Sequence, residues 1–270
     1  MIKEILNPKY DESHEFTFFI FFFLTEFILL LVFLIISFLL KLNNLSLLII
    51  FIITLLQVPF AYKILSFEEL RELRSYENWK LHYRAIGLFS IFFFSTTLAV
   101  VLIQIFFPNN TLFLEQKKVI DEINNIPTGN FYNSMLYLQE ILSNNFRVMF
   151  LSLIASILIG AGSLWILNWN ASVLGFAIGS AIYDLLRIKE PFYVAMLRGT
   201  LKYLLHGVPE IMAYVISAFA GGLIFTAVIN HHINTKVFKK VLYDASELIL
   251  ISCILLLIAG IIETFISGGL

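Results

Sequence analysis

Two ionisable side chains stand one helical turn apart inside a long apolar tract of this 270-residue chain. His206 and Glu210 occupy positions i and i+4, so a helix would place both on one face, within hydrogen-bonding reach. Such a pair can act as a proton relay, as half of a metal site, or as a polar clamp between helices. A zinc site needs further ligands, and the His-Glu-x-x-His spacing of zinc proteases does not occur. The sequence therefore favours the clamp and predicts no catalytic residue, no metal and no cofactor.

Gly207 and Pro209 stand between these two residues. Pro209 cannot donate a hydrogen bond to the carbonyl of Leu205, and a glycine lets another backbone approach closely. We therefore expect the helix to break or kink here. Broken helices beside ionisable groups mark substrate sites in many transporters, and they also occur as plain structural kinks.

The composition indicates the surroundings in which these residues lie. The chain is 59% hydrophobic and 14% charged, and several apolar runs exceed the roughly 18 to 20 residues that span a bilayer. A net charge of −1 gives no basic surface for nucleic acid. Cys253, the single cysteine, lies within an apolar run and is expected to be an inert thiol. We expect a multi-pass protein of the cell membrane, embedded in the lipid bilayer.

The apolar runs predict an all-α transmembrane helix bundle of about seven spans. We place the spans at 16–40, 45–65, 85–107, 146–167, 172–186, 203–229 and 247–266. The run at 172–186 is short for a crossing, so it is either tilted or re-entrant. The longest polar segment, 109–145, predicts a pair of amphipathic helices outside the membrane.

Charge and chain order divide the sequence into two parts. Residues 1–84 form a predicted domain, in which the first two spans make a tight hairpin and 66–84 an interfacial helix. That stretch is rich in arginine and lysine, which favours a cytoplasmic location for it and for the N-terminus. The loop at 230–245 agrees with this orientation, whereas the basic stretch 187–202 conflicts with it.

Few polar residues lie within the apolar runs, and each must face protein, water or a headgroup, because a charge at mid-bilayer costs roughly 2.5–3.5 kcal/mol. They are Glu26, Gln57, Arg147, Asn168, Asn170, Asp184, His206, Glu210 and Glu263. Glu26 pairs either across the hairpin or with another copy of the chain. Small residues permit close helix packing in the C-terminal half, so we expect the core there and the first three spans at the periphery. The glycines concerned are Gly160, Gly162, Gly175, Gly179, Gly221 and Gly222.

Three stretches in order resemble the stage II sporulation protein M family. They are residues 140–179, "LHGVPEIMAYVISAFAGG" at 205–222 and "LLLIAGIIETF" at 255–265. On this resemblance, residues 85–270 form the family's membrane core, including the extracytoplasmic segment 109–145, and the hairpin is an addition. The family has Asn-Gly where this chain has Asn170-Ala171. The positions that match the family are Asn145, Arg147, Asn170, His206, Gly207, Glu210 and Glu263. Together with Pro209 they make up the predicted intramembrane polar cluster.

The resemblance implies a function as well as a fold. In spore formers the family member is a membrane scaffold that recruits cell-wall-degrading enzymes, but relatives without an assigned role are widespread, so only the fold is carried over. We therefore expect a non-enzymatic, homo-oligomeric membrane scaffold that holds a membrane or extracytoplasmic protein partner. The alternative is a transporter, channel or lipid-handling protein with a polar cavity around the break at His206 and Glu210.

Overall fold

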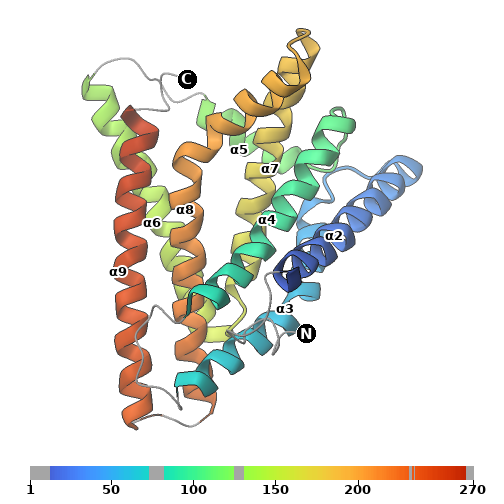
Figure 1. Ribbon diagram of the computed structural model, residues 1–270. Coiled ribbons are helices and arrows are strands. Elements are labelled where there is room, and N and C mark those ends of the chain that lie inside the picture. The colour runs from blue at the N-terminus through green and yellow to red at the C-terminus, as the bar shows by residue number, and fades with distance from the viewer. Residues whose placement is uncertain (1–12, 73–81, 125–130, 231–232, 234, 266–270) are drawn as a thin grey trace.

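The protein folds into a bundle of long helices (Figure 1). The computed structural model describes residues 13–72, 82–124, 131–230, 233 and 235–265. Within these ranges there are eight helices and no strand. They are α2 (Ser13–Leu40), α3 (Ser46–Glu72), α4 (Tyr83–Phe106), α5 (Leu114–Asn124), α6 (Phe131–Ile159), α7 (Ser163–Arg187), α8 (Phe192–Ile229) and α9 (Lys236–Phe265). All except α5 are long and apolar enough to cross a membrane, which confirms the predicted all-α bundle with seven spans.

The turn between the fourth and fifth spans lies earlier in the chain than predicted. Helix α6 ends at Ile159 and α7 begins at Ser163, so the predicted boundary at 167–172 is wrong. Gly160 adopts a φ of +72°, a left-handed conformation that favours glycine and reverses the chain. The fifth span consequently has 25 residues and is long enough to cross the bilayer, so no short or re-entrant segment is needed.

Two other predicted helices are parts of longer ones. Helix α3 continues without interruption to Glu72, so the first residues of the predicted interfacial helix belong to the second span, and 73–81 lie outside the described residues. The first amphipathic helix of segment 109–145 is α5. The second is the beginning of α6, which runs on into the membrane because no breaker follows Phe131 before Gly160.

Helix α8 lies at the centre of the packing and contacts α6, α7 and α9. Helix α4 packs along α7 and is also largely buried, so the expectation that the third span is peripheral is wrong. A Cβ at Gly175 would stand 2.7 Å from the carbonyl oxygen of Thr97, which shows how closely α7 approaches α4. The small Gly175 lets the backbone of α4 pack directly against α7, so α4 belongs to the core despite its bulky phenylalanines.

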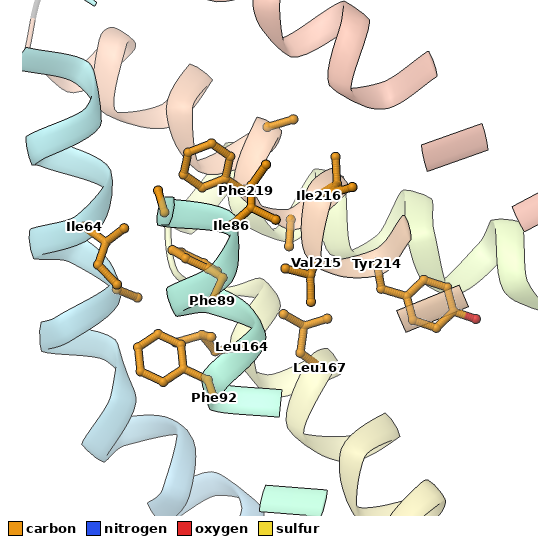
Figure 2. Close-up of a cluster of buried hydrophobic side chains, with 14 of the residues drawn as sticks. Ile64, Ile86, Phe89, Phe92, Leu164, Leu167, Tyr214, Val215, Ile216 and Phe219 are labelled. Atoms are coloured by element: carbon orange, nitrogen blue, oxygen red, sulfur yellow. The ribbon is translucent and has the colours of Figure 1, made fainter. Parts of the chain in front are cut away.

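The main apolar core contains buried residues from all seven long helices. Figure 2 shows the part of it where Ile64, Phe89, Phe92, Leu164 and Phe219 converge from α3, α4, α7 and α8. The two predicted hairpin helices contact each other, through Phe22 and Phe60 among others, but most of their contacts are with other helices: α2 packs mainly on α4, and α3 packs on α7 and α8. The N-terminal pair is therefore held by the rest of the bundle.

Helix α5 and the turn before it close one end of the α2–α3 pair. The backbone amides of Asn44 and Ser46 donate to the carbonyls of Thr111 and Leu112, at 2.9 and 3.1 Å. The side chain of Gln116, fully buried, donates to the hydroxyl of Ser172 at 3.0 Å. This polar segment is thus fixed against the membrane helices.

Candidate functional site

A buried hydrogen-bond network joins the N-terminal helices to the core. Glu26 of α2 is 1% exposed, and its two carboxylate oxygens accept hydrogen bonds from different helices. Gln57 Nε2 of α3 donates at 2.8 Å, and the Thr96 hydroxyl of α4 donates at 3.0 Å. Of the two alternatives left open for Glu26, the structure places it in pairing contacts within the chain.

Asn168 of α7 completes this network. Its Nδ2 donates to Gln57 Oε1 at 2.8 Å and to the Thr54 hydroxyl at 3.0 Å, and its Oδ1 accepts from Thr96 at 3.2 Å. Glu26, Thr54, Gln57, Thr96 and Asn168 together are the four-helix network below. Five interhelical contacts in it are 3.2 Å or shorter, and the Thr96 hydroxyl has one proton to share between Glu26 and Asn168. Four hydrogen bonds therefore form at a time, and at about 0.6 kcal/mol each in a bilayer they contribute about 2.4 kcal/mol.

These five residues differ in how clearly the sequence predicts them. Glu26, Gln57 and Asn168 stand out as polar residues in apolar runs, whereas the two threonines are ordinary in a membrane helix and were missed. The family motif pointed to Asn170 in place of Asn168. In the structure, Asn170 Nδ2 donates to the carbonyl of Ile166 in its own helix, at 2.8 Å. Only Asn168 faces the other helices.

A second polar cluster lies on the other side of α8, where α6, α8 and α9 meet. The Tyr214 hydroxyl donates to Glu210 Oε1 at 2.6 Å. Tyr137 of α6 is hydrogen-bonded to Glu263 of α9. The carboxyls of Glu210 and Glu263 lie within electrostatic range of each other. Figure 2 shows the Tyr214 ring pointing away from Ile64, Phe89 and Phe92, so the apolar core separates this cluster from the four-helix network.

The structure distributes the other predicted polar residues over several environments. His206 is half-buried on α8, one turn before Glu210. Asn145 of α6 is buried, and its Nδ2 has no hydrogen-bond partner among the described residues. Arg147, two residues further along, is exposed. The structure thus places Glu210 and Glu263 within electrostatic range of each other and leaves Arg147 on the outer face of α6.

The predicted break at Gly207 and Pro209 is not present as an interruption. Helix α8 is continuous from Phe192 to Ile229 with Pro209 inside it, and Figure 1 shows it bending along its length. A proline removes one backbone hydrogen bond, which bends a helix that its neighbours hold in place. A Cβ at Gly207 would meet nothing within 4 Å, so no backbone approaches closely here.

The six predicted packing glycines take two kinds of position. Gly160 and Gly162 form the turn between α6 and α7 described above. Gly175, Gly179 and Gly221 lie against backbone carbonyls of neighbouring helices, and Gly222 lies against the Leu65 side chain; a Cβ at any of these four would come within 2.5–2.7 Å of its neighbours. Close contact between helix backbones is therefore concentrated on α7 and α8.

Neither cluster has the composition of a metal site. Among the described residues, no group of three or more His, Cys, Asp or Glu side chains gathers closely enough to hold a metal ion. The four-helix network offers one carboxylate surrounded by amides and hydroxyls, a set suited to hydrogen bonding between helices.

Comparisons with known proteins agree with the architecture. Residues 85–268 match the family model described as Stage II sporulation protein M. The chain is also 33% identical over 152 residues to an uncharacterized protein of Methanocaldococcus jannaschii, covering 55% of this chain and 81% of that protein. No solved structure shows a significant match. The matched region runs from α4 to the end of α9, so α2 and α3 lie outside it. The chain is a member of the stage II sporulation protein M family.

Proposed function

We propose that this protein is a non-enzymatic, homo-oligomeric scaffold of the cell membrane that holds a membrane or extracytoplasmic protein partner. The observation that carries the proposal is the four-helix network. Its buried side chains hydrogen-bond to one another across α2, α3, α4 and α7. Polar groups that pair in this way fix the positions of helices, which suits a rigid platform better than a transporter whose helices must move.

The outer face of α6 supports oligomer formation. Ser143, Asn144 and Arg147 are all exposed, although they lie within the span Met135–Ile159 and Arg147 is at its middle. Polar groups on a membrane helix are costly where lipid covers them, so they generally face protein, water or headgroups. Serine and asparagine side chains both donate and accept, so each can pair with its own copy across a two-fold axis.

Cysteine cross-linking in membranes tests this proposal. With Cys253 replaced by serine, Asn144→Cys is expected to form a disulfide-linked dimer on mild oxidation. Leu250→Cys, exposed on α9, is the matched control and is expected to remain monomeric. Equal cross-linking at both positions, or none at Asn144, would count against a dimer through α6. Affinity capture of the full chain in mild detergent that recovers neither a partner nor a second copy would contradict the scaffold.

The proposed orientation places the N-terminus in the cytoplasm and α5 outside the cell. In intact cells that express the protein with Cys253 replaced by serine, a membrane-impermeant maleimide is expected to label Lys118→Cys of α5. Lys239→Cys, near the start of α9, is expected to react only after the membrane is opened. The reverse pattern would invert the topology.

The electrostatic interaction between the Glu210 and Glu263 carboxyls favours the second candidate, a transporter or channel. Two carboxyls that interact electrostatically within the membrane helices, each hydrogen-bonded to a tyrosine, can bind a cation or pass a proton. Ion and proton flux into liposomes containing the purified protein tests it. Flux that is the same for the wild type and Glu210→Ala would eliminate this candidate.

A further inference from the structure

A cavity lies at one membrane end of the bundle, between α4, α7 and α8, away from both polar clusters. Its volume is about 440 Å³, within the range of small-molecule sites. Six of its lining residues are apolar, contributed by all three helices, and the other two are Tyr183 and Arg187. The apolar set is Leu102, Ile105, Phe106, Leu186, Phe192 and Met196.

The position of this cavity indicates what surrounds it. It lies where α4 and α7 end and α8 begins, near the top of Figure 1. Phe106 and Phe192, at its border, are 67% and 66% exposed. Large exposed aromatics at the end of a membrane helix face acyl chains and headgroups. The cavity is therefore open to the hydrocarbon of one leaflet.

The charge at this end favours an anionic occupant. Arg187 lies in the cavity wall, in the last turn of α7, and no ion pair of its guanidinium is seen among the described residues. Arg198, on the neighbouring helix, is instead 3.5 Å from Glu190. An apolar cavity with one unpaired guanidinium beside the headgroup level matches a molecule with a hydrocarbon tail and a phosphate.

We propose that this cavity is a binding site for an anionic phospholipid, with an acyl chain between α4, α7 and α8 and the phosphate at Arg187. The site extends beyond the scaffold function and does not depend on it. A lipid held in this way would fill the space between the ends of three helices and couple their positions to the lipid composition of one leaflet.

Lipid titration of the full chain tests the proposal. The protein is delipidated in neutral detergent and titrated with phosphatidylglycerol or phosphatidylcholine carrying identical acyl chains, and bound lipid is counted by native mass spectrometry. We expect phosphatidylglycerol to bind about fivefold more tightly, the contribution of one basic residue near a headgroup. Arg187→Gln should abolish this preference, whereas the matched control Arg198→Gln should keep it.

Filling the cavity provides an independent test. Met196→Trp and Leu102→Trp enlarge the wall from α8 and α4, and either should weaken binding of both lipids at least fivefold. Unchanged binding in both variants, equal affinity of the wild type for the two lipids, or a retained preference in Arg187→Gln would overturn the proposal. Displacement of the lipid by inorganic phosphate alone would also overturn it, because Arg187 would then bind a free anion.

Discussion

Replacement of Asn168 by alanine should destabilise the bundle by about 3 kcal/mol. The substitution removes the hydrogen bonds to Thr54 and Gln57, worth roughly 0.6 kcal/mol each between membrane helices, and the acceptor that shares the Thr96 hydroxyl proton with Glu26. It also deprives Gln57 Oε1 of the donor described for it, and a buried polar atom without a partner costs about 1–3 kcal/mol. Both contributions arise from contacts between helices, so α3 and α4 should separate from α7 more easily.

Asn170→Ala is the matched control, because the two asparagines lie two residues apart on the same helix. Asn170 is only half-buried and its Nδ2 donates within α7, so its loss should change stability by no more than about 0.5 kcal/mol. The gain in helix propensity from asparagine to alanine is the same at both positions and cancels in the comparison. Reversible unfolding in mixed micelles with increasing dodecyl sulfate measures both free energies. Equal losses in the two variants would refute the assignment of the network to Asn168.

Two further predictions concern glycine packing and pH. Gly207→Ala should raise the free energy of unfolding by up to about 1 kcal/mol, since the added Cβ meets no atom. Gly221→Ala should lower it by about 1–3 kcal/mol, because the added Cβ would stand 2.5 Å from a carbonyl oxygen of α6. Thermal melts in detergent that rank the two variants the other way would contradict this prediction. The hydrogen bonds from Lys118 and Asn44 hold the pKa of the Glu115 carboxyl below its ordinary value of 4.5. Because folding lowers the pKa of Glu115, the stabilisation is complete above pH 4.5 and is lost as the pH falls through the lower pKa of the folded state. The melting temperature should therefore fall more between pH 6 and pH 3 for the wild type than for Glu115→Gln.

Much of the architecture is encoded in local sequence. Apolar runs of sufficient length predict membrane helices, because a bilayer leaves no alternative partner for the backbone amides and carbonyls of such a run. The polar composition of α5 predicts this helix, and the apolar runs predict the approximate positions of the seven spans. The predicted boundary between the fourth and fifth spans is wrong because the turn at Gly160 lies between two equally apolar helices, and the polar residues after it resemble a loop.

The relation between Asn168 and Asn170 shows where local information ends. Both are asparagines in the same apolar run, and only the rotation of α7 against three other helices decides which one lies between them. Arg147 illustrates the same limit, because its exposure depends on which face of α6 packs against α8 and α9. A polar residue in a membrane helix indicates that a partner is needed, but it does not identify the partner.

The sequence by itself determined that this chain is a helical membrane protein of a particular family, because hydrophobic length and motif order are local properties. The tertiary structure alone decided that the polar groups form two separate clusters, that α4 belongs to the core and that an apolar cavity with one arginine lies between three helix ends. These features depend on contacts between residues as far apart in the chain as Glu26, Thr96 and Asn168. Such contacts are set by how whole helices pack, and no single segment contains that information.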